Sequence, residues 1–195
     1  MKRIGLFCGC FNPIHKGHLR AAEEFLRTGE LERVFLVPAS GRYGKLRGLA
    51  PDGVHRLRMC ALAAGGRDDI AVCDFEIRSP GLPDTMDTVE YFRDRFPGAV
   101  LFLCMGGDTA GMVPRWACFP ELRESVSFLV IRRSGGSGAP EELTGRGARV
   151  TYLDREEDGI SSTAIRGKLL RGESSIPELD EKVLGYIREH ALYGK

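Results

Sequence analysis

The sequence has almost no net charge: 28 lysines and arginines stand against 27 aspartates and glutamates. Non-specific nucleic-acid binding depends on net positive charge, so this composition excludes a general nucleic-acid-binding protein. No nucleic-acid partner is expected, and any site for an anion must be built locally.

Long hydrophobic runs are missing as well. No stretch approaches the ~18 consecutive apolar residues that a membrane helix needs. The N-terminal run IGLFCGCF is interrupted by glycine and is too short for a signal peptide with its cleavage site. We therefore expect a cytoplasmic protein without a membrane partner.

The chain also lacks any Cys-x-x-Cys pair, although it holds six cysteines. They are Cys8, Cys10, Cys60, Cys73, Cys104 and Cys118. Most lie inside apolar runs, where a reduced thiol behaves as a small buried hydrophobe. A structural zinc site or a dithiol redox motif is therefore not expected, and we predict no metal-binding residues.

Short apolar runs alternate with helical patterns along the chain. Strands are predicted at 3–8, 33–39, 70–77, 99–106, 126–133 and 148–154, and helices at 18–29, 51–66, 84–98, 162–171 and 178–192. Continuous apolar strands separated by helices are typical of a parallel sheet covered on both faces. The expected fold class is α/β, with a doubly wound, mainly parallel sheet and helices on both faces.

Two long irregular stretches interrupt this alternation. Residues 38–53 carry several basic side chains, and loops of this length are often functional. Residues 133–148 are rich in glycine and serine, and we interpret them as a loop because too little chain follows for a second core. The prediction is one domain, 1–195, with a C-terminal helical segment at about 160–193.

The stretch CGCFNPIHKGH, from Cys8 to His18, sits between the first strand and the first helix. Ligands of doubly wound sheets bind at this end of the strands, and a helix N-terminus favours an anion. His15 and His18, three residues apart, share one face of the first turn. A metal site with Cys8 and Cys10, or a plain helix start, are the other interpretations; the cysteine spacing does not suit zinc. We favour a phosphate site.

A second hydroxyl-rich stretch, GISSTAIRGKLLRG, begins the helix predicted at 162–171. It groups Ser161, Ser162 and Thr163, with Arg166 one turn later. An ordinary N-cap needs only one such hydroxyl. Hydroxyl and backbone donors with a guanidinium suit a second phosphate. Two such sites indicate a polyphosphate held between two helix N-termini.

Together, GCFNPIHKGH and ISSTAIR resemble the nucleotidyltransferase superfamily that carries a His-x-Gly-His motif near the N-terminus. The chain looks most like the bacterial nicotinate mononucleotide adenylyltransferases. The segments FLVPA, DTMDTVEYF, MGGDT and RWACFPELRESVSFLVIRR follow in that family's order, so the likeness covers nearly the whole chain. It implies a Rossmann-like nucleotidyltransferase domain.

The resemblance implies transfer of AMP from ATP, with Mg²⁺, to the phosphate of nicotinate mononucleotide, releasing pyrophosphate in NAD biosynthesis. The acceptor phosphate is itself the nucleophile, so no protein nucleophile or general base is needed. Alternatives are the same chemistry on nicotinamide mononucleotide or another phosphate acceptor, and a non-catalytic nucleotide-binding module. ATP and a mononucleotide are the expected partners, and a homo-oligomer is possible.

The resemblance also assigns roles to residues of this chain. His15, His18 and Arg166 would be catalytic, with His18 at the α-phosphate. The residues expected to bind ATP are Gly9, Cys10, Phe11, Gly107, Asp108, Arg133, Ser161, Ser162 and Thr163. Lys45, Thr85 and Trp116 would bind the acceptor, with Trp116 stacked on the pyridine ring.

Three positions depart from the family pattern. Cys10 stands where threonine or serine is common, and the loop around Lys45 lacks the usual Pro-His-Lys. Asp84 replaces an aromatic residue beside the nicotinate, where its charge would repel the nicotinate carboxylate if it pointed inward. Nicotinamide mononucleotide, which has no such carboxylate, therefore competes as the acceptor.

Overall fold

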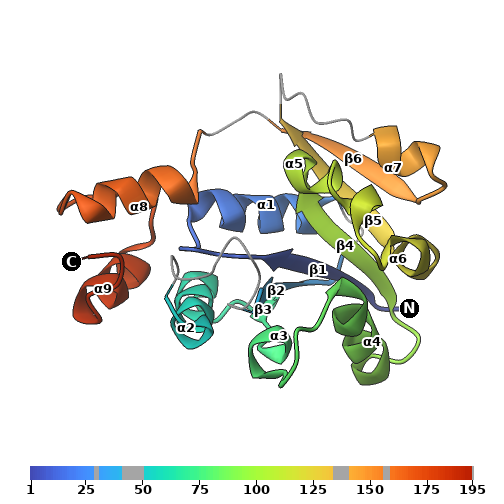
Figure 1. Cartoon of the computed structure of the whole chain (residues 1–195), viewed down its shortest axis with the longest axis horizontal. Helices are drawn as coiled ribbons and strands as arrows, with labels where there is room; N and C mark the ends of the chain where they lie inside the picture. The colour runs from blue at the N-terminus through green and yellow to red at the C-terminus, as the bar shows by residue number, and fades with distance from the viewer. Residues whose placement is uncertain (29–30, 41–50, 134–140, 156–158, 195) are drawn as a thin grey trace.

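The computed structural model describes residues 1–28, 31–40, 51–133, 141–155 and 159–194. Over these residues, six parallel strands form one sheet in the order β3-β2-β1-β4-β5-β6 (Figure 1). The strands are β1 (Arg3–Gly9), β2 (Arg33–Pro38), β3 (Ile70–Val72), β4 (Val100–Gly106), β5 (Ser127–Arg133) and β6 (Val150–Arg155). This is the strand order of a doubly wound sheet, which confirms the predicted fold class.

The helices connect these strands and close the chain. They are α1 (Lys16–Arg27), α2 (Gly53–Ala64), α3 (Phe75–Arg78), α4 (Thr85–Arg95), α5 (Gly107–Ala110), the 3-10 turn η2 (Val113–Arg115), α6 (Phe119–Ser125), α7 (Glu141–Gly145), α8 (Ser162–Leu170) and α9 (Glu181–Glu189). The central strand β1 pairs with β2 from Ile4↔Arg33 to Gly9↔Pro38. Its other edge pairs with β4, so β1 and β4 form the centre of the sheet.

The strand predicted at 70–77 is wrong in its second half. Pairing with β2 ends at Val72, and the chain turns into the short helix α3 at Phe75. Asp74 is ion-paired with Arg78 one helical turn later, an arrangement that a strand cannot make. A short apolar run does not distinguish a buried strand from a buried helical turn, and that is why the pattern misled.

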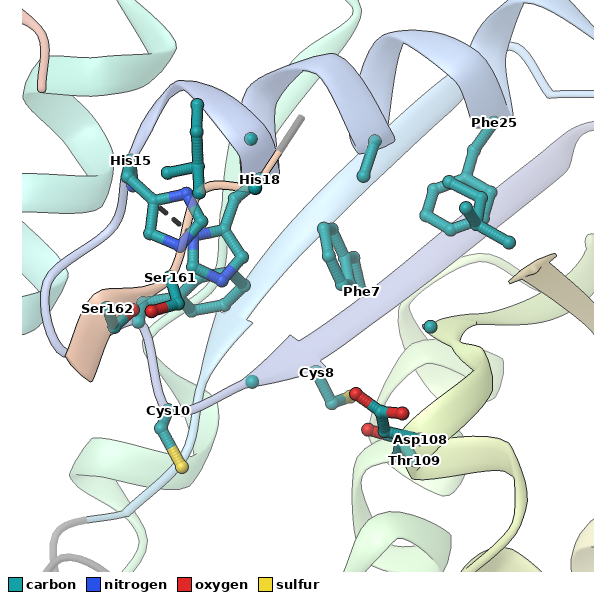
Figure 2. A pocket seen from close by; sticks show the side chains of 18 residues that line it. Phe7, Cys8, Cys10, His15, His18, Phe25, Asp108, Thr109, Ser161 and Ser162 are labelled. Carbon is teal, nitrogen blue, oxygen red and sulfur yellow. Dashed lines mark hydrogen bonds between the residues drawn. The ribbon is translucent and has the colours of Figure 1, made fainter. Parts of the chain in front are cut away.

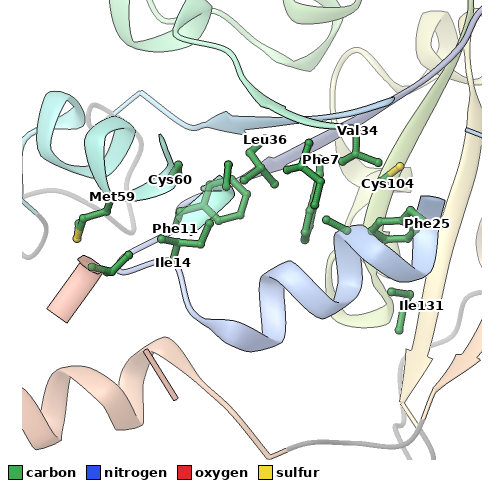
Figure 3. Packing of buried hydrophobic residues seen from close by; sticks show 14 of the residues in the cluster. Phe7, Phe11, Ile14, Phe25, Val34, Leu36, Met59, Cys60, Cys104 and Ile131 are labelled. Carbon is green, nitrogen blue, oxygen red and sulfur yellow. The ribbon is translucent and has the colours of Figure 1, made fainter. Parts of the chain in front are cut away.

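Alternate residues of the central strands supply two separate cores, because successive side chains of a strand point to opposite faces. Phe7 and Leu36 join the core beneath α1 and α2, together with Phe25 (Figure 3). Leu6 and Phe35 join the core on the opposite face, where α4 and α6 pack. Burial on both faces explains why these strands are continuously apolar.

The C-terminal segment packs beside α2, close to the start of α1 (Figure 1). Several hydrogen bonds fasten it to the connection between β1 and α1 and to the first residue of α1. Ser162 Oγ donates to the Pro13 carbonyl at 3.0 Å, and Lys16 Nζ donates to the Pro177 carbonyl at 2.7 Å. Tyr193 Oη donates to Asn12 Oδ1 at 2.7 Å. The last part of the chain therefore helps to shape the first connection.

Among the described residues, no helix is both long enough and apolar enough to cross a membrane. That one domain holds the whole chain stays a prediction.

Phe25 offers a test of the core beneath α1. Its side chain is fully buried and meets the ring of Phe7 edge-on at 5.5 Å. Phe25→Ala leaves a cavity and should lower the free energy of unfolding by about 3–5 kcal/mol. Urea denaturation measures this loss. The control Arg27→Gln removes only an exposed ion pair with Glu24 and should leave the midpoint unchanged; equal stability of both variants would contradict the described packing.

Candidate active site

A cavity of about 350 Å³ opens at the carboxyl ends of the central strands (Figure 2). Its walls come from the end of β1, the first turn of α1, the β4–α5 junction and the segment that leads into α8. Connections from β1 and β4 run to opposite sides of the sheet, so the cavity lies at the topological switch point, the usual ligand site of this architecture.

The structure brings the two predicted phosphate motifs to this cavity. The predicted site residues that line it are Gly9, Cys10, Phe11, His15, His18, Asp108, Ser161 and Ser162. The histidine turn and the serine cluster are far apart in the sequence, yet both line this cavity. Gly107, Thr163, Arg166, Thr85 and Trp116 do not line the cavity, and Lys45 lies outside the described residues.

The two histidines are organised by the start of α1. His15 is the N-cap residue, and its backbone N–H donates to Nδ1 of His18 at 3.2 Å. The imidazole rings stack with centroids 3.7 Å apart and an interplanar angle of 30°. Because Nδ1 of His18 accepts a hydrogen bond, a neutral His18 ring carries its proton on Nε2. His18 can therefore donate one hydrogen bond to a ligand.

Burial keeps His18 neutral. Its ring lies 5.1 Å from that of Phe11 and 6.2 Å from that of Phe7. This burial, with a smaller effect of the adjacent His15, holds the pKa of His18 well below its usual value. At neutral pH the ring is therefore uncharged, and it can still donate a hydrogen bond from Nε2.

The N-terminus of α8 supplies the facing wall. Ser161 caps the helix by accepting from the Ala164 N–H at 3.2 Å. Arg166, one turn on, donates to the Asn12 carbonyl at 2.8 Å and to Thr163 Oγ1 at 3.1 Å. In this arrangement Arg166 and Thr163 join α8 to the connection after β1.

Asp108 occupies the β4 side of the cavity. It follows Gly107 in the first turn of α5 and lies beside Thr109. Asp108 is the only acidic residue among the described residues that line the cavity. Arg133, the last residue of β5, ends the strand next to β4, and the position of its side chain is outside what the structure describes.

The residues predicted to bind the acceptor lie apart from this cavity. Thr85 begins α4, and its neighbour Asp84 caps that helix by accepting from the N–H groups of Met86 at 2.7 Å and Asp87 at 3.1 Å. Trp116 lines a separate hollow of about 490 Å³. Met86 and Trp116 pack against the same core, so α4 and the tryptophan segment form one region.

Comparison with known proteins agrees with this architecture. The family model described as cytidylyltransferase-like matches residues 6–168. The chain belongs to that cytidylyltransferase-like family. A protein of Shouchella clausii named probable nicotinate-nucleotide adenylyltransferase is 34% identical, covering 100% of this chain and 98% of its own. A Neisseria meningitidis serogroup B protein of the same name is 36% identical, with both chains fully covered.

Solved structures share the cytidylyltransferase-like fold of this chain. The Plasmodium falciparum nicotinic acid mononucleotide adenylyltransferase complexed with NaAD superposes with a TM-score of 0.81 at 18% identity, covering 99% of this chain and 98% of that one. The same enzyme complexed with APC gives 0.79 at 17% identity over the same shares. At these identities the likeness supports the fold, and it confirms the expected Rossmann-like sheet.

Two buried charged residues of this family member were missed by the sequence interpretation. Arg56 in α2 is 0% exposed, and Glu76 in α3 is 5% exposed. Glu76 accepts from Thr88 Oγ1 at 3.1 Å, and burial raises its pKa to about 7. A signal existed for Arg56: it lies three and four residues before Met59 and Cys60, on the buried face of the helix.

The neutral state of His18 makes folding sensitive to acid. An unfolded histidine takes up a proton near pH 6.5, whereas the folded state resists protonation until a lower pH. The free energy of unfolding should therefore fall as the pH drops below about 6.5, by up to ~1.4 kcal/mol per pH unit, until the folded pKa is reached.

His18→Asn is the matched variant, because asparagine offers an acceptor to the His15 N–H and does not titrate. Urea denaturation between pH 7.5 and 5 compares the two proteins. The raised pKa of Glu76 acts with the opposite sign, but it is present in both and cancels in the difference. Two parallel stability curves would show that His18 titrates normally in the folded protein.

Proposed function

We propose that this protein transfers AMP from ATP to nicotinate mononucleotide, giving the deamido dinucleotide and pyrophosphate. The observation that carries this proposal is the meeting of the His15–His18 turn and the Ser161–Ser162 turn around one cavity at the switch point of the sheet. The names of the relatives at 34% and 36% identity over the full chain support the choice of substrates.

The reaction requires positioning rather than a protein nucleophile. A phosphate monoester is ionised at neutral pH and attacks the α-phosphate of ATP directly, while pyrophosphate leaves in line. Catalysis then depends on aligning two anions and stabilising the charge that develops on the transferred phosphoryl group. Good alignment alone can lower the barrier by roughly 7–11 kcal/mol.

Two helix N-termini provide the donors. Helix α1 has 12 residues and α8 has nine, and both begin at the cavity wall. Their first backbone N–H groups and the positive ends of their dipoles favour a polyphosphate between them. His18 donates from Nε2 to an oxygen of the α-phosphate, and Ser161 and Ser162 lie where the leaving phosphates would extend, with Arg166 behind them.

The remaining ATP contacts follow from the strand ends. Backbone N–H groups of the segment Gly9–Phe11 face the phosphates from β1. Asp108 accepts hydrogen bonds from the ribose hydroxyls at the end of β4, next to Gly107. Arg133 ends the neighbouring strand β5 and stays a predicted ATP contact.

Magnesium is expected to accompany ATP. Within the described residues, no group of three or more potential ligands is placed to hold a metal ion, and the cavity wall carries the single carboxylate of Asp108. This donor set fits an ion held by phosphate oxygens and water, as Mg²⁺ commonly is. Such an ion would supply positive charge against that of the phosphates.

The acceptor belongs on the α4 side, where Thr85 and Trp116 lie. Lys45, which is outside the described residues, stays a predicted acceptor contact. Thr85 would offer its backbone to the nicotinate carboxylate and Trp116 its ring face. Asp84 adjoins this position, and its charge favours nicotinamide mononucleotide as the second candidate acceptor. Its carboxylate is engaged by two helix N–H groups, which weakens that preference.

Product analysis tests the proposed reaction. Purified protein with Mg²⁺ and ATP is given nicotinate mononucleotide, nicotinamide mononucleotide or phosphopantetheine, and the products are separated by chromatography. His18→Ala should lower kcat by about 10²–10³-fold, the usual cost of removing one preorganised donor.

His190→Ala is the matched control, since His190 is exposed at the end of α9 and does not line the cavity. It should keep the wild-type rate. If the wild type binds ATP but adenylates no acceptor, the protein is a nucleotide-binding module and the proposal fails.

Two substitutions at Asp84 separate its charge from its capping role. Asp84→Asn keeps a good N-cap and removes the charge, so it should raise the preference for nicotinate over nicotinamide mononucleotide by about three- to tenfold, as expected for ~1 kcal/mol of repulsion. Asp84→Ala should change selectivity equally and also lower the free energy of unfolding by ~1 kcal/mol. The ratio of the two kcat/KM values measures the first effect. An unchanged ratio in both variants would place the Asp84 charge away from the acceptor.

A further inference from the structure

Arg56 is the one charged side chain among the described residues that is 0% exposed. Its guanidinium donates to three backbone carbonyls: Nη1 to Cys10 at 2.8 Å, Nη2 to Ala39 at 2.6 Å and Nε to Pro51 at 3.4 Å. These carbonyls belong to the segment after β1, the segment after β2 and the segment before α2. One side chain therefore joins three pieces of chain behind the cavity.

The charge of Arg56 has no carboxylate paired with it in the described parts of the chain. All three of its hydrogen-bond acceptors are neutral carbonyls. Burial lowers the pKa of the guanidinium, but an arginine stays protonated at neutral pH. Asp52 and Glu76 are the carboxylates that act on Arg56 electrostatically, but neither is hydrogen-bonded to it. A buried charge held mainly by carbonyls is costly, which makes a purely space-filling role a poor account of Arg56.

The bond to Cys10 fixes a peptide group at the cavity wall. In a trans peptide the carbonyl and the following N–H point in opposite directions, so the Phe11 N–H points away from Arg56. Cys10 and Phe11 line the cavity and Arg56 does not, which places the peptide between the two. Within the described chain the Phe11 N–H has no hydrogen-bond partner.

The backbone at Phe11 has an uncommon conformation, which the hydrogen bond from Arg56 to Cys10 helps to hold. Phe11 has φ of 43°, a left-handed conformation that is uncommon for a residue with a bulky side chain. Such conformations persist when surrounding contacts determine them, and they concentrate at functional sites. The ring of Phe11 holds one side of the residue in the core beneath α1 (Figure 3). Arg56 holds the preceding peptide through the Cys10 carbonyl.

We propose that Arg56 is a positioning residue, which orients the Cys10–Phe11 peptide so that the Phe11 N–H donates to a phosphate of ATP. The inference rests on the proposed function for the identity of the nucleotide. Arg56 itself does not contact substrate; its side chain acts through the backbone of Phe11.

A first test uses the wild-type protein. The ten phenylalanines are labelled with ¹⁵N, and Phe11→Leu assigns the Phe11 amide by the loss of its signal. Addition of the non-hydrolysable α,β-methylene analogue of ATP should move the Phe11 amide proton downfield more than the other nine. A Phe11 amide that does not respond while the analogue binds overturns the proposal without any Arg56 variant.

The second test uses Arg56→Lys, which keeps the charge but not the three-way fork of donors. It should lower kcat/KM for ATP at least tenfold, change KM for the acceptor less than twofold and remove the downfield shift of Phe11. Arg58→Lys, at an exposed position of the same helix, should behave as the wild type. Met59→Ala is the stability control, because it weakens the packing of the buried face of α2 and leaves the Arg56 guanidinium in place.

An equal loss of kcat/KM for ATP in folded Met59→Ala would show that general destabilisation explains the effect. Unchanged ATP kinetics in Arg56→Lys would also refute the proposal. The amide measurement needs no acceptor, so it separates the two ideas: a Phe11 shift in a protein that makes no dinucleotide rejects the proposed function and keeps the role of Arg56.

Discussion

The segment Cys10–His15, between β1 and α1, is the constraint on which the rest of the site depends. The backbone of this connection lies outside both the strand and the helix, so its polar groups need partners from elsewhere. Hydrogen bonds reach it from Arg56 in α2, from Ser162 and Arg166 in α8, and from Tyr193 in the turn after α9. Its geometry is therefore a tertiary property, although its sequence is the most recognisable in the protein.

That distinction explains what could be predicted from the sequence. The continuous apolar strands and the alternation with helices predict a doubly wound sheet, and the switch point of such a sheet locates the histidine turn. The serine cluster was predicted as a second phosphate site on local grounds, and the fold brings it to the same cavity. The partner of Arg166 could not be predicted in this way, because its hydrogen bond to Asn12 joins residues 154 positions apart in the sequence.

The missed features share a physical cause. Arg56 and Glu76 are charged residues that the fold buries. Because charged side chains are mostly exposed, a local sequence pattern predicts that such residues face solvent. The helical turn after Val72 was missed because an edge strand is free to end wherever its neighbour stops pairing. The helical pattern of α2 does place Arg56 on the buried face, but the carbonyls of Cys10 and Ala39 that hold its charge belong to other segments.

The hydrogen bond from Tyr193 to Asn12 has a consequence for how the protein is made. A chain leaves the ribosome N-terminus first, and its domains tend to fold in that order. The connection after β1 emerges early, yet two of the residues that hold it, Ser162 and Tyr193, emerge well over a hundred residues later. A nascent chain can therefore assemble β1, β2 and α1 before these contacts form, and the proposed nucleotide site takes its final shape only after Tyr193 has emerged.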